Sequence, residues 1–533
     1  MNCRSHDRAG EGCFTQDSAR TLRGDTMSNE KHAPAAEISS ATTPSQLTGI
    51  ILAAGEGTRM KSKHAKVAHE ILGRPMIQWV VEAAREAGCT RIIVVVGSHA
   101  DEVRALLADQ VDVECVEQTE RLGTGHAIRV ALEQAGIASG PVLVLCGDTP
   151  LLRGATLANL VRTATAGAPA SSSAAPAAAI PGANPADAAK SPRGLGGALL
   201  TMTYADPTGY GRVMLDADGL AERIVEQKDC APEQALVTTC NAGVYCFDAA
   251  LLAVHVGDLT PNNAQHEYYI TDLVSILREA GAPLAALSCE DPDELMGVNS
   301  RVQLAQATRA MQGRINDALM AQGVTMVDPA SVWVGPDVRI GRDTTILPQV
   351  MLMGATTIGE DCLIGPNTRL TDTEVGERCA LDETVAVSAL IDNDVECGPR
   401  AYLRPGAHLM DGSKAGTHVE IKKSTIGRGS KVPHLSYVGD ATIGEDVNLG
   451  AGTITCNYDG RDKYPTAVGD RTFVGSSTML VAPVTLGADV TVGAGSVITS
   501  DVPDGSLAVA RGRQIVKEGW LPRWKRDEAR SSK

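Results

Sequence analysis

A glycine-rich loop near the start of the chain has residue types that bind a polyphosphate. The segment Ile50-Ile-Leu-Ala-Ala-Gly-Glu-Gly-Thr-Arg-Met60 begins as an apolar run and ends in polar residues. Gly55 and Gly57 let the backbone approach a ligand closely, so that consecutive N–H groups can contact phosphate oxygens. Arg59 and Lys66 add positive charge. The same pattern also occurs in ordinary turns, so the loop alone leaves both interpretations open.

Two further segments favour a nucleotide as the ligand. Gln118 and the loop Leu122-Gly-Thr-Gly-His126 are suited to holding a base through amide and backbone contacts. Asp148 directly follows the apolar run Pro141-Val-Leu-Val-Leu-Cys-Gly147, at the carboxyl end of a predicted strand. A carboxylate in that position can bind Mg²⁺ through oxygen, although a helix cap is the alternative role. Asp206-Pro-Thr-Gly-Tyr-Gly-Arg212 is a third glycine-rich turn.

A second set of reactive residue types lies in the C-terminal half. His434 can accept a proton near neutral pH, which suits a general base for an amine that attacks a thioester. Arg404 and Lys422 offer positive charge for a sugar phosphate. Asn457 and Tyr458 lie in the segment Thr455-Cys-Asn-Tyr-Asp-Gly-Arg-Asp-Lys-Tyr-Pro465, which interrupts a regular pattern. Taken singly, each of these residues also fits an exposed turn.

The elements that must position the first set alternate between strands and helices. Residues 48–158 contain short apolar runs separated by amphipathic stretches such as Met76 to Ala87. This order predicts a doubly wound α/β domain with a parallel sheet, whose ligands bind at the carboxyl ends of the strands. Residues 164–197 are rich in Ala, Pro, Ser and Gly, and we interpret them as a flexible surface insertion.

A six-residue period replaces this pattern from about residue 330. Aliphatic residues stand six apart at Val334, Ile340, Ile346, Leu352, Ile358, Ile364 and Leu370, and again at Val468, Val474, Leu480, Leu486, Val492 and Ile498. This period is typical of hexapeptide repeats, in which three short strands close one triangular coil and each aliphatic side chain points inward. The sequence therefore predicts a left-handed parallel β-helix, with function expected where the excursion at 455–465 interrupts it.

Composition limits the partners of the protein. The 533 residues carry a formal net charge of −16, which argues against nucleic acid as the main partner. The 13 cysteines are scattered singly, so we expect free thiols in a reducing compartment rather than disulfides or a zinc site. No stretch is long and apolar enough to cross a membrane, and we expect a cytoplasmic protein. Residues 1–46 are set aside as an extension, and either Met1 or Met27 is the true start.

The motif Leu52-x-x-Gly-x-Gly-Thr-x-Met60 with Lys66 resembles the signature of the sugar-nucleotide pyrophosphorylases. From Thr48 to Trp520 the chain resembles the bacterial family of bifunctional N-acetylglucosamine-1-phosphate uridylyltransferases/glucosamine-1-phosphate N-acetyltransferases. The resemblance implies acetylation of glucosamine 1-phosphate by acetyl-CoA, then transfer of UMP from UTP with release of pyrophosphate. The product, UDP-N-acetylglucosamine, feeds peptidoglycan and lipid A. A homotrimer with Mg²⁺ as cofactor is also implied.

The resemblance also implies roles for individual residues. In the first domain, UTP and product would contact Leu52, Ala53, Ala54, Gly55 and Lys66, the uracil would contact Gln118, Gly123 and Thr124, Mg²⁺ would bind Asp148 and Asn299, and the N-acetylglucosamine part would contact Gly211, Glu226 and Asn241. In the second domain, His434 would be the base, glucosamine 1-phosphate would bind Arg404, Lys422, Tyr437 and Asn448, and acetyl-CoA would bind Ala451, Asn457, Tyr458, Ser476, Ala494 and Arg511.

The chain departs from the family pattern in the Lys66 loop, where Ala65 replaces a usual proline and Ala68 a usual leucine. We divide the chain into the extension, a uridylyltransferase domain (47–298), a helical linker (299–329) and an acetyltransferase β-helix with a C-terminal tail (330–533). Two alternatives stay open at this stage. One is a single-activity pyrophosphorylase with a regulatory or assembly β-helix, and the other is a non-enzymatic binding subunit.

Overall fold

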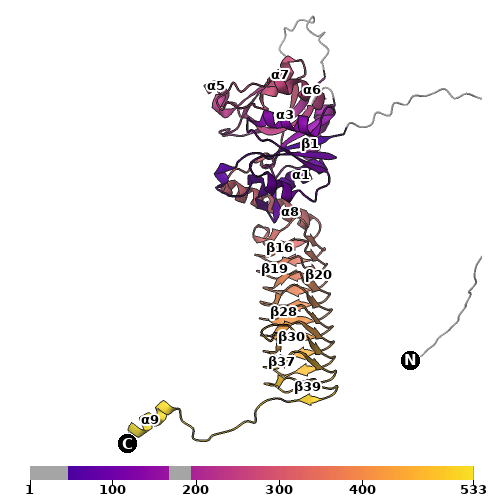
Figure 1. The fold of residues 1–533 in the computed structure, drawn as a ribbon, viewed down its shortest axis with the longest axis vertical. Coiled ribbons are helices and arrows are strands. Elements are labelled where there is room, and N and C mark those ends of the chain that lie inside the picture. The colour runs from indigo at the N-terminus through magenta and orange to yellow at the C-terminus, as the bar shows by residue number, and fades with distance from the viewer. Residues whose placement is uncertain (1–45, 167–193, 532–533) are drawn as a thin grey trace, which may run out of the picture. The chain divides into compact units, whose positions relative to one another are not determined.

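The computed structural model describes residues 46–166 and 194–531 (Figure 1). The predicted extension up to residue 45, the choice between Met1 and Met27, and most of the 164–197 insertion lie outside the described residues. The helices and 3₁₀ turns that bear on the site are α1 (Met76–Glu86), α2 (Ala100–Leu106), α3 (Thr124–Ala135), α4 (Gly154–Thr165), α5 (Pro232–Ala235), α6 (Ala249–His255), α7 (Asp272–Glu279), α8 (Arg301–Ala321), α9 (Arg523–Ser531), η1 (Thr58–Met60) and η2 (Lys66–Ala68).

A nine-stranded mixed sheet forms the centre of the N-terminal domain. Its strand order is β5-β4-β1-β6-β10-β7-β11-β9-β8. Four neighbouring strands, β5 to β6 in that order, are parallel, whereas β10 runs antiparallel to β6 and to β7. The strands are β1 (Thr48–Leu52), β4 (Arg91–Val96), β5 (Val113–Glu117), β6 (Pro141–Cys146), β7 (Gly197–Thr203), β8 (Arg212–Leu215), β9 (Leu220–Val225), β10 (Thr239–Asp248) and β11 (Leu284–Ser288).

Helices cover both faces of this sheet, as the alternation of strands and helices predicts. Successive side chains of a strand point to opposite faces, and in β1 the fully buried Ile50 and Ile51 belong to different cores. Ile51 packs with apolar residues of α1, α2 and α4, and Ile50 packs with those of α3, α6 and α7. The α/β doubly wound class is therefore confirmed, and the antiparallel strands are an addition to it.

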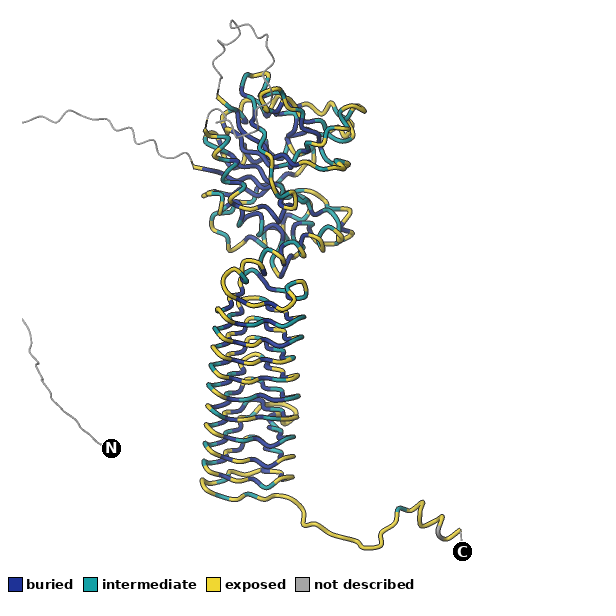
Figure 2. The backbone as a smooth tube through the Cα atoms, turned by 180° about the vertical axis from the view of Figure 1, so that it is seen from behind, coloured by how far each residue is buried: buried dark blue, intermediate teal, exposed yellow. Residues whose placement is uncertain are grey.

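Three parallel sheets of short strands form the C-terminal domain. They contain eleven, ten and nine strands, beginning with β12 (Thr325–Met326), β13 (Trp333–Val334) and β14 (Arg339–Ile340). Each strand from β12 to β37 pairs with the strand three elements later, so one coil visits all three sheets. All the aliphatic residues of the predicted six-residue series are at most 9% exposed, and Figure 2 shows the buried positions recurring along the coils. This confirms the predicted hexapeptide β-helix.

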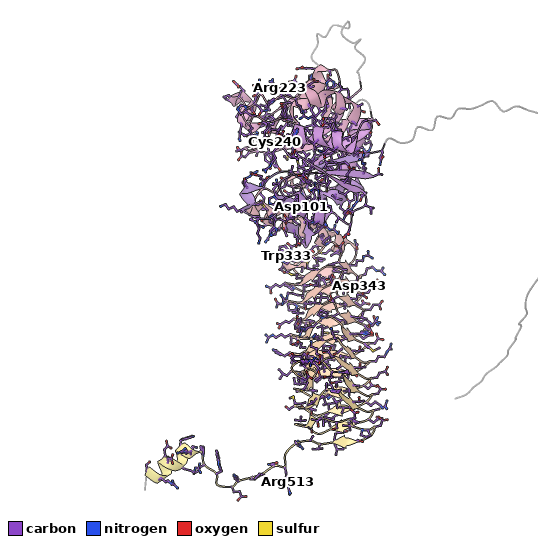
Figure 3. The ribbon with its side chains drawn as sticks, in the orientation of Figure 1. Asp101, Arg223, Cys240, Trp333, Asp343 and Arg513 are labelled. Carbon is purple, nitrogen blue, oxygen red and sulfur yellow. The ribbon has the colours of Figure 1, made fainter. Side chains whose placement is uncertain are left out.

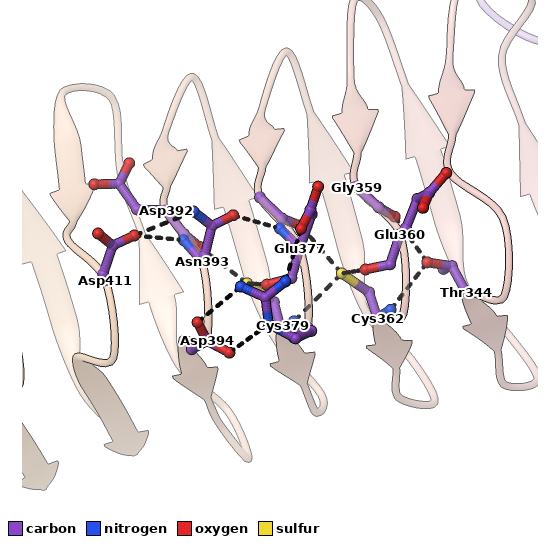
Figure 4. Close-up of polar contacts among 12 residues, drawn as sticks. Thr344, Gly359, Glu360, Cys362, Glu377, Cys379, Asp392, Asn393, Asp394 and Asp411 are labelled. Atoms are coloured by element: carbon purple, nitrogen blue, oxygen red, sulfur yellow. Dashed lines mark hydrogen bonds and ion pairs between the residues drawn. The ribbon is translucent and has the colours of Figure 1, made fainter. Parts of the chain in front are cut away.

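Polar groups also connect successive coils (Figure 4). The amide of Cys362 donates to the Thr344 hydroxyl at 3.0 Å, and the amide of Cys379 donates to the Cys362 sulfur at 3.3 Å. On the outer side, the Glu377 amide donates to Asn393 at 2.8 Å. Such contacts satisfy the turn backbone and fix the register of one coil on the next. The cysteines therefore act here as small, buried hydrogen-bonding groups.

Helix α8 connects the two folded parts, which belong to one compact unit. Gln312 and Asn316 are almost fully buried and donate side-chain hydrogen bonds to the carbonyl of Val332 at 2.6 and 3.0 Å. Val332 precedes Trp333, which is labelled in Figure 3. Because buried amides need partners, these bonds fix the C-terminal half of α8 against the first coil.

The last strand of the β-helix is β41 (Leu507–Ala508), and an exposed segment leads from it to α9. Several large apolar side chains of this tail are exposed, including Ile515, Trp520 and Trp524. Within the residues that the structure describes, no helix has the length and apolar character needed to cross a bilayer.

Candidate active sites

A cavity of about 480 Å³ opens at the carboxyl ends of β1 and β6. The two strands are parallel neighbours, with Leu52 opposite Cys146, so the loops that follow them begin side by side. The Gly147 amide donates to the Leu52 carbonyl at 2.9 Å and ties the loops together. The cavity is lined by these residues proposed from the sequence: Leu52, Ala53, Ala54, Gly55, Lys66, Gln118, Gly123, Thr124 and Asp148.

Lys66 and Asp148 line this cavity, and Asn299, which is not among its lining residues, contacts Lys66. The Lys66 ammonium donates to Asp148 Oδ2 at 2.5 Å and to Asn299 Oδ1 at 3.1 Å. The side chains of Lys66 and Asp148 are each only 15% exposed. Two side-chain oxygens from separate parts of the chain thus converge on one cationic group. These oxygens fit Mg²⁺, which takes carboxylate and amide oxygens as ligands.

The start of α8 fixes the orientation of Asn299. Ser300 caps the helix, and its hydroxyl accepts from the Gln303 amide at 3.3 Å. The Gln303 side chain in turn accepts from the backbone amide of Asn299, the residue before the cap, at 2.9 Å. The Val298 amide donates to the Asp148 carbonyl at 2.8 Å. These bonds position the two proposed oxygen ligands next to each other although they are far apart in sequence.

Gly57 is needed for the position of Lys66. Its φ is +62°, a region that strongly favours glycine, and a Cβ at Gly57 would lie 2.7 Å from the Lys66 Cβ. The backbone of the glycine-rich loop therefore packs directly against the stem of the lysine. The sequence predicted that Gly57 lets a ligand approach the loop closely. In the structure, the group that approaches Gly57 closely is the Lys66 side chain.

The groups proposed for the base also line the cavity. Gln118 is 5% exposed and donates to the Gly123 carbonyl at 3.1 Å. Gly123 has φ +108°, and a Cβ there would lie 2.6 Å from the Tyr268 carbonyl oxygen. The Thr124 hydroxyl accepts from the Ile270 amide at 3.1 Å. The loop is thus held closely against residues 268–270.

The three residues proposed for the sugar also come together. The Asn241 amide donates to the Gly211 carbonyl at 2.8 Å, and a Cβ on Gly211 would lie 3.4 Å from Glu226 Oε1. The Thr271 hydroxyl donates to Glu226 Oε1 at 3.3 Å. Burial raises the pKa of Glu226 and outweighs the hydrogen bond from Thr271, which lowers it. A half-buried carboxyl beside a polar amide suits sugar hydroxyl or amide groups.

Sequence reasoning missed one charged pair at the cavity. Arg121 and Glu56 both line the cavity and form an ion pair with each other. Arg121 lies beside the predicted base-binding loop, and a cation within three residues of Gln118 was the available signal. Arg59, by contrast, is exposed in η1 and is not among the lining residues. Its proposed role in binding phosphate has no support from this arrangement.

On the β-helix, the two proposed phosphate-binding cations occupy one column. Leu403 is in register with Ile421, so Arg404 and Lys422 follow at the same position on successive coils. Arg404 donates to Glu420 at 2.8 Å, and this bond raises the pKa of the Arg404 guanidinium. The ammonium of Lys463, which the sequence reasoning did not single out, lies beside Lys422 and lowers its pKa. Three cations therefore gather around the excursion, which suits a phosphate.

Tyr437 and Asn457 extend this polar face. A Cβ on Gly439 would lie 2.4 Å from the Tyr437 hydroxyl, so the phenol lies directly over that glycine. Asn457 is 6% exposed and donates to Asp440 at 2.5 Å and to the Tyr437 hydroxyl at 3.5 Å. Tyr458 is exposed in the excursion, and its hydroxyl donates to the Gly460 carbonyl at 2.7 Å.

His434 belongs to a second column of residues, which lies at the edge between two of the parallel sheets. It is exposed and ends β30 (Lys431–His434). Ala451, Ser476 and Ala494 each stand two residues after the inward residue of a strand in the same sheet, in successive coils. The Arg511 guanidinium donates to the Ala494 carbonyl at 2.8 Å. These four of the six proposed acetyl-CoA residues thus form a continuous strip in the column of His434, whereas Asn457 and Tyr458 lie in the excursion.

Asn448 is the one proposed sugar-phosphate residue that stands apart in the single chain. It begins β33 (Asn448–Leu449), in the same sheet as β30, whereas Arg404 and Lys422 belong to the neighbouring sheet. Tyr437 starts β31 (Tyr437–Gly439) of that neighbouring sheet, directly after the turn that follows His434. One chain therefore presents the proposed groups on two adjoining faces of the prism.

The fold and these two sites define the class of protein: a nucleotidyltransferase domain joined to a hexapeptide-repeat transferase. Family models agree. Residues 49–214 match the MobA-like NTP transferase domain, residues 337–372 match the bacterial transferase hexapeptide of six repeats, and residues 465–500 match the hexapeptide repeat of succinyl-transferase.

Curated relatives identify the family. The chain is 47% identical to the bifunctional protein GlmU of Heliobacterium modesticaldum over 89% of this chain and 98% of that protein. It is 46% identical to that of Streptomyces avermitilis, over 89% of this chain and 94% of the relative. The chain belongs to the GlmU family of bifunctional proteins. This membership confirms the prediction of a bifunctional enzyme with one uridylyltransferase and one acetyltransferase domain.

Proposed function

We propose that the two sites described above catalyse consecutive steps in the synthesis of UDP-N-acetylglucosamine. The β-helix site acetylates glucosamine 1-phosphate with acetyl-CoA. The cavity of the first domain then joins the resulting N-acetylglucosamine 1-phosphate to UMP from UTP and releases pyrophosphate. The observation that carries the proposal is the convergence of Lys66, Asp148 and Asn299 beside a cavity that the groups proposed for the base also line.

In the first domain, transfer requires positioning and charge neutralisation more than covalent chemistry. An oxygen of the sugar phosphate attacks the α-phosphorus of UTP, the bond to the β-phosphate oxygen breaks, and pyrophosphate leaves. Gln118 and the backbone at Gly123 would orient the uracil. Glu226 and Asn241 would hold the sugar, and the Lys66 ammonium would stabilise negative charge on the phosphates. Leu52 to Gly55 would contact the nucleotide by their backbone.

The side-chain oxygens of Asp148 and Asn299 favour Mg²⁺ as the cofactor, with these two residues as its protein ligands. The Lys66 ammonium bound between their oxygens indicates that this point of the cavity attracts a cation. A bound Mg²⁺ supplies positive charge that neutralises phosphate oxygens. Lys66 would then be free to turn from the carboxylate toward the phosphates.

In the β-helix, the amine of glucosamine 1-phosphate attacks the thioester carbonyl of acetyl-CoA. His434 would take the proton that the amine loses, while the carbon–sulfur bond breaks and CoA leaves. Arg404 and Lys422, with Tyr437, would bind the sugar phosphate. The strip of Ala451, Ser476 and Ala494, with Arg511, would hold acetyl-CoA, and Asn457 and Tyr458 would border it. Small residues along that strip leave room for an extended ligand.

A homotrimer is the assembly that we propose, and we assign the protein to the cytoplasm, where UTP and acetyl-CoA are available. The separation of Asn448 from Lys422 within one chain supports an assembly in which adjoining faces of different β-helices complete a site. The closed symmetry of most homo-oligomers is compatible with such packing. Sedimentation or light scattering tests this assignment.

The reactions are tested with purified protein, glucosamine 1-phosphate, acetyl-CoA, UTP and Mg²⁺, following free CoA thiol and pyrophosphate. We expect both products, and we expect pyrophosphate to depend on acetyl-CoA when glucosamine 1-phosphate is the only sugar. Pyrophosphate without any CoA release, on supplied N-acetylglucosamine 1-phosphate, would instead identify a single-activity pyrophosphorylase with an assembly β-helix.

A further inference from the structure

The backbone that presents Lys66 is weakly packed on its N-terminal side. Residues 61–64 are mostly exposed, and the next buried side chains are those of Ala65 and Val67. Lys66 itself begins the short 3₁₀ turn η2. A catalytic ammonium must be held to within a fraction of an ångström, so this loop needs an anchor from another element.

Glu102, in the first turn of α2, is that anchor. Its Oε2 accepts a hydrogen bond from the Ala65 amide at 2.7 Å, and its Oε1 lies 2.7 Å from Nδ1 of His64. Because a carboxylate only accepts, Nδ1 of His64 carries the proton in this pair. One side chain thus holds both residues that immediately precede Lys66, without touching Lys66 or the cavity.

The Ala65 contact has the larger consequence of the two. Ala65 is 4% exposed, and in the intact chain its amide donates to Glu102 rather than to bulk water. A buried donor left without an acceptor costs more than the bond itself contributes, whereas removing donor and acceptor together is nearly neutral. The His64 contact is more exposed, with side chains 55% and 31% accessible, and contributes less.

The backbone at Ala65 also has the geometry of proline. Its φ is −53° and its ψ is 139°, and the proline ring fixes φ at about −65°. A proline here would restrict the loop covalently and would need no acceptor, because it has no N–H. In this chain alanine occupies the position, the amide is present, and Glu102 accepts from it. The carboxylate therefore has a positional role that a proline could replace.

We propose that Glu102 is a positioning residue for nucleotidyl transfer, which fixes the Lys66 loop through the Ala65 amide and the His64 ring. The inference rests on the proposed function of Lys66. It predicts a specific coupling: a proline at position 65 makes Glu102 dispensable. A purely structural carboxylate in α2 would show no such dependence on residue 65.

The test compares Glu102→Ala, Ala65→Pro and the double variant in the full chain. Glu102→Ala is expected to lower kcat/KM for uridylyl transfer about 10- to 100-fold, chiefly through kcat, since a displacement of about 1 Å costs up to about 100-fold. In Ala65→Pro the ring Cδ takes the place of the amide hydrogen, so the Glu102 side chain, which is 31% exposed, has to turn away from it. With that movement Ala65→Pro alone should stay near wild type, and the double variant should return to the level of Ala65→Pro. Asp101→Ala is the matched control, because Asp101 is fully exposed on the same helix and pairs only with Arg104 among the described contacts.

Two further readouts separate this inference from the proposed function. Acetyl transfer should be unchanged in every variant. Amide hydrogen exchange over residues 61–68 should rise in Glu102→Ala and fall again in the double variant, whether or not the protein transfers UMP. If Glu102→Ala impairs folding, seen as lost acetyl transfer, Glu102→Gln takes its place, and a smaller decrease with the same rescue is expected.

Unchanged kcat/KM and exchange in Glu102→Ala would overturn the proposal. So would an inactive Ala65→Pro, or a double variant as defective as Glu102→Ala. Wild-type protein that never transfers UMP would instead refute the proposed function and leave the exchange measurement to decide whether Glu102 holds the loop.

Discussion

Asp148→Asn changes one atom of the proposed metal site and removes its negative charge while keeping the side-chain shape. In the structure Asp148 Oδ2 lies 2.5 Å from the Lys66 ammonium, and both side chains are 15% exposed. Little water therefore screens the interaction between this carboxylate and a cation. The variant retains an oxygen at the same place, so any loss reports on charge more than on packing.

The expected loss follows from the electrostatics of the site. Two unit charges about 4 Å apart interact by about 4 kcal/mol at an effective dielectric constant of about 20. A divalent ion interacts more strongly, but desolvation offsets part of the gain. Taking about 4 kcal/mol as the lost transition-state stabilisation, kcat/KM falls about 1000-fold, at about 1.4 kcal/mol for each factor of ten.

The assay is pyrophosphate release from UTP and N-acetylglucosamine 1-phosphate with Mg²⁺. Binding of Mn²⁺, followed by electron paramagnetic resonance, gives a second readout that does not need turnover, and it should weaken in parallel. Acetyl transfer on the same sample is the control for folding, because His434 lies in the other domain. Uridylyl transfer within about tenfold of wild type, or unaltered Mn²⁺ binding, would refute the assignment of Asp148 as a metal ligand.

Three other substitutions test separate parts of the two sites. His434→Ala should reduce acetyl transfer by about 100- to 10,000-fold, the usual contribution of a general base, and leave uridylyl transfer unchanged; undiminished release of CoA would exclude the base role. Gly57→Ala should lower uridylyl kcat/KM about tenfold or more, because its Cβ would lie 2.7 Å from the Lys66 Cβ, and wild-type kinetics would contradict that packing argument. Burial raises the pKa of Glu226, so the folded state holds its proton more tightly than the unfolded chain does. The free energy of unfolding therefore falls as pH rises from the unfolded-state pKa through the folded-state pKa. Glu226→Gln should therefore raise Tm at pH 8 relative to wild type, with a smaller gain at pH 4, and raise KM for the sugar phosphate; a Tm gain independent of pH would contradict the assigned cause.

The β-helix was predictable in detail because its sequence repeats. Each coil has to place an aliphatic side chain in the same interior position, and the residues from Val334 to Leu370 keep that spacing and are buried. In the middle of the domain several spacings shorten to five, as between Ile421 and Ile426, yet both residues stay buried. A strict period cannot anticipate those coils, because the turns absorb the missing residue.

The nucleotide cavity was predictable in its parts but not in its connections. Strands β1 and β6 are continuous apolar runs, so Asp148 could be assigned to a strand end. The partners of Lys66 could not be found from spacing, since Asn299 is 233 residues away in sequence. The Arg121–Glu56 pair and the position of Lys463 beside Lys422 likewise depend on contacts between loops, which leave no periodic signal.

The structure also gives a physical reason for joining the two domains through one long helix. The N-terminal end of α8 holds Asn299 beside Asp148 through the Ser300 cap, and its C-terminal half buries Gln312 and Asn316 against carbonyls of the first coil. Without that coil, both amides would lose their acceptors and α8 would lose part of its support. The β-helix therefore stabilises the helix whose first turn orients a proposed metal ligand of the other domain.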